Sequence, residues 1–385
     1  MLLNPWVPAQ IDSPVGAAYD LLPQRAGRQP LLDLSQASPP YPPAPAVLHH
    51  LQRCLADGAS AGYTDVPGLP KLREAFAADL SQDYQAALDP ENVLVTSGCN
   101  QAFCLVAGVL AQPGDEIVLP LPYYFNHDMW LRLNGITPVY LQPDADLVPR
   151  AAALEELITP RTRAVLLVTP GNPTGVTIPP EEIAAFAEVA RRHDIALVLD
   201  ETYRSFRATE GPAHALYAEA DWSDHVIGLF SFSKEFAIPG YRVGAVVSGP
   251  KVGREVAKLM DCVAVCAPKI GQEAAWAGLT QATDWRIERA AEMSSRRAAF
   301  QAALADRPGG FEILACGGYF GWLRHPFLDE PTPDLARRLL IDHDLLLLPG
   351  TAFEPTDSRS LRVSIAGVDE GTAGDLADRL RAAAV

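Results

Sequence analysis

The chain of 385 residues is long enough for two or three domains of roughly 100–200 residues each. Hydrophobic residues make up 48% and charged residues 20%, which is the composition of a folded globular protein and excludes a largely disordered chain. The net charge of −16 disfavours non-specific binding to nucleic acid, because an acidic surface repels the phosphate backbone.

The sequence shows no sign of membrane insertion or export. It contains no run of about 18 apolar residues, so we expect no transmembrane helix. Residues 1–20 carry three prolines and no Lys or Arg, unlike a secretory signal. No two cysteines form a C-x-x-C pair, and we expect six buried free thiols, without a metal site, in a cytoplasmic protein. The six are Cys54, Cys99, Cys104, Cys262, Cys266 and Cys316.

In chain order, the first segment is rich in proline and the next is a series of alternating elements. Residues 1–45 predict an N-terminal arm that enters a small domain, with a plain linker as the alternative. Apolar runs predict buried strands, and longer periodic segments predict helices between them. The strands are expected at 92–96, 116–119, 163–169, 195–200, 225–230 and 243–248, and the helices at 46–57, 69–82, 99–110 and 180–193.

This alternation predicts an α/β domain over residues 46–280, with a mostly parallel sheet flanked by helices. A long helical stretch follows at 251–305. Residues 281–385 then predict a smaller α+β domain, built together with the N-terminal arm. Its strands are expected at 311–314, 319–323, 345–348 and 360–364, and its helices at 333–341 and 368–383.

The most informative segment is residues 231–244, S-F-S-K-E-F-A-I-P-G-Y-R-V-G, which places Lys234 between an apolar strand and a Gly/Pro turn. A lone lysine is usually solvated. Few charged neighbours surround this one, which favours a desolvated amine with a lowered pKa that can form a Schiff base. The segment resembles the cofactor-lysine motif of the class I/II aminotransferases, which are fold type I pyridoxal-phosphate enzymes. The resemblance extends over about residues 31–383.

The resemblance implies which residues hold the ring of pyridoxal 5′-phosphate. Asp200 ends an apolar strand, where open α/β sheets bind ligands, and would pair with the pyridine nitrogen; a helix N-cap is the alternative. Tyr203 and Asn172 would donate to the phenolate oxygen, although N-P-T-G around Asn172 is also typical of a plain turn. Tyr124 would face the ring, whereas an aromatic pair such as Tyr123 and Tyr124 is more often core.

Phosphate binding is expected at a strand-to-helix junction, where free N–H groups and the helix dipole favour a dianion. The junction residues are Ser97, Gly98, Cys99 and Asn100, for which a plain N-cap by Ser97 is the alternative. The resemblance adds Ser231, Ser233 and Arg242 as side-chain donors. It also implies that Tyr63 reaches the phosphate of a neighbouring subunit, so that a homodimer shares its active sites.

Substrate binding is expected to involve Arg362, in S-L-R-V-S-I-A-G, as the clamp for an α-carboxylate, with Asn172 beside it. A structural salt bridge is the alternative for Arg362. Ala37 stands where the family usually carries Gly, so its backbone N–H would meet the carboxylate in a tighter pocket. Lys269 would bind a distal acidic group of the substrate, or else is a solvated lysine at a helix start.

These residues together predict an aminotransferase that moves an amino group between an L-amino acid and a 2-oxo acid by a ping-pong mechanism, with Lys234, Asp200 and Tyr203 as catalytic residues. The first alternative is another reaction on the same cofactor, by a C–S β-lyase, a decarboxylase or an amino-acid oxidase. The second is a cofactor-sensing transcription regulator, against which the net charge of −16 and the short leading segment argue. The fold cannot select the amino donor.

Overall fold

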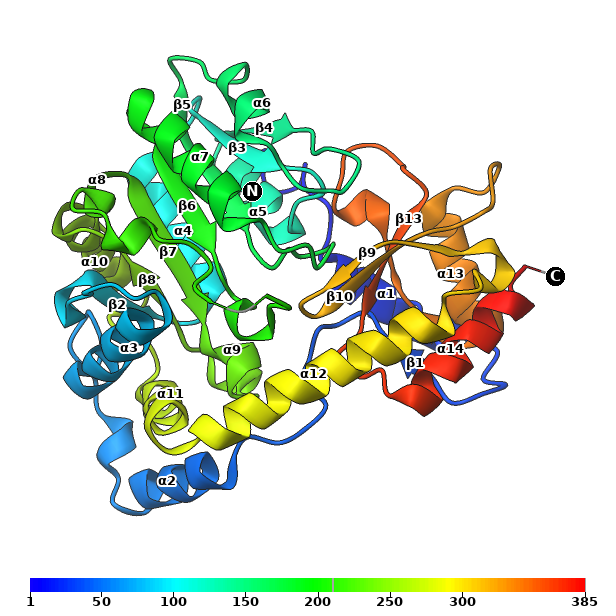
Figure 1. Ribbon diagram of the computed structural model, residues 1–385, viewed down its shortest axis with the longest axis horizontal. Helices are drawn as coiled ribbons and strands as arrows, with labels where there is room; N and C mark the ends of the chain where they lie inside the picture. The colour runs from blue at the N-terminus through cyan, green and yellow to red at the C-terminus, as the bar shows by residue number, and fades with distance from the viewer. Residues whose placement is uncertain (210, 385) are drawn as a thin grey trace.

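The computed structural model describes residues 1–209 and 211–384. Within these residues, a seven-stranded sheet with flanking helices forms the larger part of the molecule, and a four-stranded sheet forms the core of the smaller part (Figure 1). The expected fold class is therefore confirmed. None of the described helices is both long enough and apolar enough to cross a membrane.

The large sheet has the strand order β2-β8-β7-β6-β5-β3-β4. All neighbouring strands are parallel except β8, which is antiparallel to β2 and to β7. The central strands are short apolar runs buried on both faces, as a parallel sheet covered by helices requires. The strands are β2 (Val93–Thr96), β3 (Glu116–Pro120), β4 (Thr137–Leu141), β5 (Thr162–Val168), β6 (Ala196–Asp200), β7 (Val226–Ser231) and β8 (Gly244–Val247).

Several helices around this sheet begin at proline, which lacks a backbone N–H and so loses no hydrogen bond in the first helical turn, where N–H groups have no partner within the helix. The apolar faces of these helices and of the sheet share one hydrophobic core. The helices are α2 (Pro45–Ala56), α3 (Pro70–Asp83), α4 (Cys99–Leu110), α5 (Phe125–Leu133), α6 (Ala151–Glu155), α7 (Pro180–Arg192), α8 (Trp222–His225), α9 (Phe232–Glu235), α10 (Pro250–Ala264) and α11 (Lys269–Gln281).

The small sheet is antiparallel, in the order β12-β13-β10-β9. The N-terminal arm joins this part, because β1 pairs in parallel with β11. Helix α12 (Thr283–Ala303) runs from beside α11 in the larger part to β9 and α14 in the smaller part (Figure 1). The other elements are α1 (Pro14–Asp20), β1 (Leu32–Asp33), β9 (Glu312–Gly317), β10 (Phe320–Arg324), α13 (Thr332–His343), β11 (Leu345–Leu346), β12 (Leu348–Pro349), β13 (Ser360–Ser364) and α14 (Glu370–Ala382).

Some expectations need correction. The helical stretch 251–305 is three helices, because Val265 has a positive φ of 62° and Ala282 is non-helical. The strand expected at 345–348 is divided between β11 and β12, which lie in different sheets. The expectation of six buried thiols is wrong, since Cys99 is buried, Cys262 is exposed and the other four are half-buried. The boundaries of the segments 1–45, 46–280 and 281–385 stay a prediction.

Candidate active site

The strands β5, β6 and β7 end at one edge of the large sheet, and a cavity of about 310 Å³ lies beyond that edge. Parallel strands bring the residues that follow their carboxyl ends together, which is why side chains far apart in the sequence meet here. The cavity is lined by Val15, Gln36, Ala37, Cys99, Asn100, Tyr124, Phe125, Val168, Asn172, Asp200, Thr202, Tyr203, Ser231, Ser233, Lys234, Pro239, Arg242 and Arg362.

Lys234 enters the cavity from α9, the short helix that follows β7. Ser231 caps this helix, because its hydroxyl accepts a hydrogen bond from the backbone N–H of Ser233 at 3.2 Å. The Lys234 ammonium donates to the carbonyl oxygen of Ala37, on the N-terminal arm. Burial and the nearby guanidinium groups of Arg362 and Arg242 lower the pKa of Lys234 to about 8. Roughly a tenth of this amine is therefore unprotonated at pH 7, far more than for a solvated lysine, and can act as a nucleophile or a base.

Asp200 is the buried carboxylate at the end of β6. Its Oδ1 accepts from the backbone N–H of Thr202 at 3.0 Å, and its Oδ2 lies 3.5 Å from Nε2 of His127. Burial by itself would raise the pKa of Asp200, but His127 and Thr202 reverse that effect and hold the pKa below its usual value. Asp200 thus stays ionised in a buried site, where it can pair with a cationic ring nitrogen.

His127 had no assigned role in the sequence. The structure buries it in the first turn of α5, against the ring of Phe103 at a centroid distance of 4.3 Å and edge-on to Tyr124 at 5.1 Å. These contacts fix the imidazole behind the Asp200 carboxylate. No local sequence signal marks this role, because it depends on the turn that connects β3 to α5.

Arg362 reaches the cavity from β13 in the small sheet. Its Nη1 donates to Oδ1 of Asn172 at 2.9 Å, its Nη2 donates to the carbonyl oxygen of Ser35, and its Nε has no partner among the described atoms. Burial lowers the pKa of Arg362 to about 10, although Tyr203 and Tyr124 raise it, so it remains cationic at neutral pH. A buried guanidinium with an unpartnered N–H group is suited to bind a planar carboxylate.

The loop that carries Asn172 is pressed against the small sheet. A Cβ atom on Gly175, whose φ is 77°, would lie 2.2 Å from the carbonyl oxygen of Gly317 at the end of β9. Only glycine allows the two backbones this close approach. The contact fixes Asn172, which follows β5 of the large sheet, beside Arg362 of the small sheet.

Gly98 and Arg242 form the part of the site nearest the start of α4. Gly98 has a φ of 90° and a Cβ atom there would lie 2.5 Å from Nη2 of Arg242. Arg242 also donates to the carbonyl oxygens of Pro239 at 2.9 Å and Ser97 at 3.5 Å. The first N–H groups of α4 have no partner within the helix. A guanidinium beside free N–H groups is suited to bind a phosphate.

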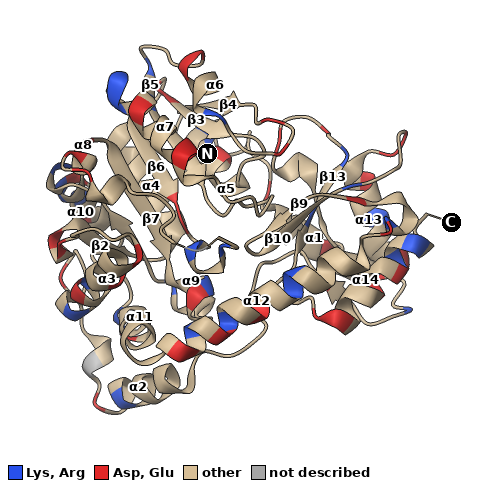
Figure 2. Ribbon diagram, in the orientation of Figure 1, with Lys and Arg blue, Asp and Glu red and all other residues tan. Residues whose placement is uncertain are grey.

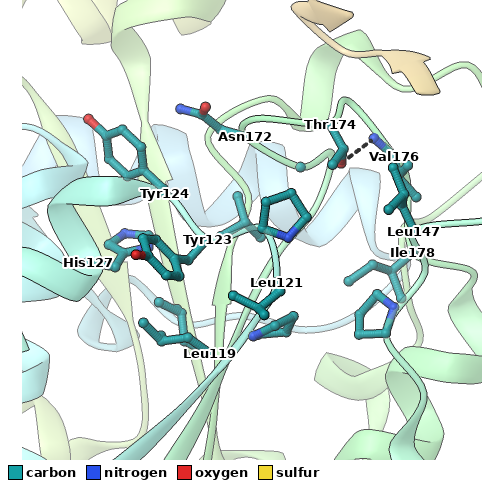
Figure 3. A pocket seen from close by; sticks show the side chains of 16 residues that line it. Leu119, Leu121, Tyr123, Tyr124, His127, Leu147, Asn172, Thr174, Val176 and Ile178 are labelled. Carbon is teal, nitrogen blue, oxygen red and sulfur yellow. Dashed lines mark hydrogen bonds between the residues drawn. The ribbon is translucent and has the colours of Figure 1, made fainter. Parts of the chain in front are cut away.

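Tyr124 and Tyr203 complete the walls of the cavity, and burial raises the pKa of each, so both remain neutral donors. A smaller cavity of about 40 Å³ shares Tyr124 and Asn172 with the main one, and Figure 3 shows it with His127 beside Tyr124. Tyr123 lines the smaller cavity but not the main one, and the choice of Tyr124 as the residue that faces the ring stays a prediction.

The structure brings most of the expected site residues to the cavity. Ser97 and Gly98 lie behind Arg242 and do not line it, and neither does Lys269 at the start of α11. Tyr63 also lies outside the cavity, with 82% of its surface exposed. The charged lining residues are three cations, Lys234, Arg242 and Arg362, and one anion, Asp200. The cavity is thus suited to anions, although the whole chain is strongly acidic.

Comparison with known proteins agrees with this geometry. The chain is 29% identical to the aromatic aminotransferase ISS1 of Arabidopsis thaliana, over 91% of this chain and 89% of that protein. It is 30% identical to the arginine–pyruvate transaminase AruH of Pseudomonas aeruginosa, over 87% and 85% of the two chains. A solved structure of a double mutant of Thermus thermophilus aspartate aminotransferase matches with a TM-score of 0.91, at 26% identity and over the full length of both chains.

The sequence model of the family "Aminotransferase class I and II" matches residues 29–380, which include every expected site residue. The chain therefore belongs to the class I and II aminotransferases and is an aminotransferase.

Proposed function

We propose that the chain is a pyridoxal-5′-phosphate-dependent aminotransferase that moves an amino group between an L-amino acid and a 2-oxo acid. The observation that carries this proposal is the position of the Lys234 amine. It has a pKa of about 8 and shares one cavity with the ionised Asp200 carboxylate and the Arg362 guanidinium. A nucleophilic amine, a buried anion and a carboxylate-binding cation are the three groups that this chemistry requires.

The residues of the cavity fit pyridoxal phosphate. The close approach of Arg242 to Gly98, with the free N–H groups of α4 beside it, suits the phosphate dianion. Asp200, supported by His127, suits a protonated pyridine nitrogen. Asn172 and Tyr203 suit the phenolate oxygen, and Lys234 suits the aldehyde. Ser231, Ser233, Cys99 and Asn100 complete the proposed cofactor site, and Tyr124 its wall.

When bound, pyridoxal phosphate withdraws electrons from the Cα atom of an attached amino acid and so acidifies its Cα–H bond. The chain's own residues then have distinct tasks. Arg362 binds the α-carboxylate and, with Asn172, fixes the orientation of Cα. The unprotonated amine of Lys234 takes the proton from Cα and later returns it, for which a pKa of about 8 is well matched to neutral pH. Tyr203, as a neutral phenol, would donate a hydrogen bond to the phenolate oxygen of the cofactor.

Transamination is favoured over lyase, decarboxylase or oxidase chemistry because the named relatives are transaminases. Their names specify aromatic residues, arginine and aspartate as substrates, so they do not select a donor for this chain. The cations that line the cavity are those with proposed roles toward phosphate, carboxylate and aldehyde. A substrate whose side chain ends in an acidic group would therefore need a cation other than Lys234, Arg242 and Arg362. We propose Lys269 for that role.

We also propose a homodimer in the cytoplasm. Tyr63 is highly exposed and lies outside its own cavity, as a residue that serves a neighbouring active site would. The six free cysteines agree with a reducing compartment. No nucleic-acid or membrane partner is proposed.

Covalent trapping tests the proposal. Borohydride reduction of the yellow holoprotein, followed by peptide mapping, is expected to place the cofactor on Lys234. The variant Lys234→Ala should lose the label and the turnover, whereas Lys251→Ala, which removes an exposed lysine of α10, should keep both. A label on another lysine, or turnover by Lys234→Ala without an added amine, would contradict the proposal.

A further inference from the structure

Glu235 follows Lys234 directly in the sequence, yet it does not line the cavity. Its carboxylate is buried, with 3% of the residue exposed, and it collects three donors on Oε1. These are the Ser205 hydroxyl at 2.7 Å, Nη1 of Arg286 at 2.9 Å and Nη2 of Arg204 at 3.2 Å. Figure 2 shows the charged residues of α9 beside those at the start of α12.

Arg204 follows Tyr203 directly and begins the short helical turn Arg204–Phe206. Its guanidinium is buried and contacts three carboxylates: Glu235, Asp79 at 2.5 Å and Asp83 at 3.0 Å. Burial would lower the pKa of Arg204, but Glu235 and Asp79 raise it well above its usual value. Arg204 is thus a buried cation in contact with the Glu235 carboxylate, and neither residue lines the cavity.

The position of this pair matters because the segments that carry Tyr203 and Lys234 lie beyond the ends of β6 and β7, where the sheet no longer connects them by backbone hydrogen bonds. The last backbone hydrogen bond between them runs from the Glu201 N–H to the Leu229 carbonyl oxygen, at 2.9 Å. Beyond it, β6 continues toward Tyr203 and β7 continues into α9. Among the described residues, every hydrogen bond between segments 202–207 and 232–238 ends on the carboxylate of Glu235.

We propose that Arg204 and Glu235 are positioning residues for transamination, which fix the segment of Tyr203 and the helix of Lys234 relative to each other. Arg286, in the first turn of α12, donates to the Glu235 carboxylate. Asp79 of α3 forms ion pairs with both Arg204 and Arg286. The inference rests on the proposed function. It adds that the alignment of the Lys234 amine depends on a charge pair outside the cavity.

The alternative is that the pair stabilises the fold without affecting the chemistry. A matched control is available in Glu273 of α11, a buried carboxylate that accepts from Lys71 at 2.6 Å and lies 2.6 Å from Nε2 of His50. The variant Glu273→Gln removes a buried carboxylate and its contacts with His50 and with Lys71, whose side chain is 41% exposed; none of these three residues lines the cavity.

The test compares Glu235→Gln with Glu273→Gln as holoenzymes. The amino-acid substrate is one that removes the visible absorbance band of the cofactor in the wild-type protein. For Glu235→Gln we expect kcat per loaded site to fall about tenfold or more, with KM changed by less than about threefold. We also expect a shift in the pH at which the visible absorbance band of the bound cofactor is half converted, here called the midpoint. Glu273→Gln should lower the melting temperature but leave kcat and the midpoint unchanged. An unchanged kcat and midpoint in Glu235→Gln would overturn the proposal.

A double variant covers the case in which Glu235→Gln does not fold. Replacing a buried ion pair by apolar residues often preserves stability, so Arg204→Met/Glu235→Leu should fold. If this variant melts like the wild type but turns over about tenfold more slowly, the positioning role is supported. Full turnover would overturn it. Failure of the proposed function is distinguishable, because then the wild-type protein itself would show neither a label on Lys234 nor transamination.

Discussion

Replacing Arg362 by glutamine tests how the cavity binds its substrate. Arg362 has 3% of its surface exposed and lies between the rings of Phe320 and Phe353, with its guanidinium carbon 4.9 Å and 4.8 Å from their centroids. This packing holds the guanidinium in one place. Glutamine removes the charge and shortens the side chain, while Asn172 and Ser35 lose their donor.

The size of the effect follows from the contacts that an α-carboxylate would make. Two charge-assisted hydrogen bonds to a guanidinium contribute roughly 1.5–3 kcal/mol each, or about 3–6 kcal/mol together. Each ~1.4 kcal/mol corresponds to a factor of ten, so kcat/KM should fall by about 10²- to 10⁴-fold. Lys234 and Asp200 should keep their positions, because they follow strands of the large sheet, but loss of the Arg362 charge should raise the pKa of Lys234.

The assay compares an amino acid with the amine that lacks its carboxylate. Wild-type enzyme should prefer the amino acid strongly, and Arg362→Gln should lose most of that preference because its activity toward the amino acid falls far more than its activity toward the amine. Arg324→Gln, which removes a partly exposed arginine at the end of β10, serves as the control and should behave as wild type. If Arg362→Gln kept the full preference for the amino acid, another group would bind the carboxylate and the reasoning would be refuted.

Three further outcomes are expected. In Gly98→Ala the added Cβ would lie 2.5 Å from Arg242, so cofactor affinity measured by absorbance titration should fall about tenfold or more. Gly114→Ala has a similar φ of 92° but open space around it and should lose stability without losing affinity. In the cofactor-free protein, the pKa of Lys234 is about 8 when folded against 10.5 when unfolded. The unfolded state therefore binds more protons between these pH values, and stability rises with pH across that window. The melting-temperature advantage of Lys234→Met over wild type should be largest below pH 8 and shrink toward pH 10. Tyr63→Phe should weaken cofactor binding in a protein that sediments as a dimer, and unchanged affinity would contradict the shared site.

Much of the site could be predicted because its residues stand at the ends of apolar strands. Asp200 and Ser231 end β6 and β7, and Asn172 follows β5, so the strand pattern alone places all three at one edge of the sheet. The resemblance then added roles for Lys234 and Arg362. Helix α4 was predicted with its observed bounds, since its apolar run begins directly after the turn at Gly98.

What the sequence could not provide depends on contacts between distant segments. His127 supports Asp200 only because α5 folds back over the sheet edge, and Glu235 meets Arg204 only because β6 and β7 are neighbours. Residues 345–349 form one apolar run, but β11 pairs with the N-terminal arm and β12 with β13. Local periodicity carries no information about such partners.

The two halves of the proposed chemistry come from different sheets. The large sheet supplies Lys234 and Asp200, and the small sheet supplies Arg362. Their relative position depends on the backbone contact between Gly175 and Gly317 and on the hydrogen bond from Arg362 to Asn172. A change in how the small sheet packs would therefore move the carboxylate relative to the amine without altering any residue that contacts the cofactor. The packing of the small sheet is therefore one way to change which amino donor is accepted without replacing Lys234 or Asp200.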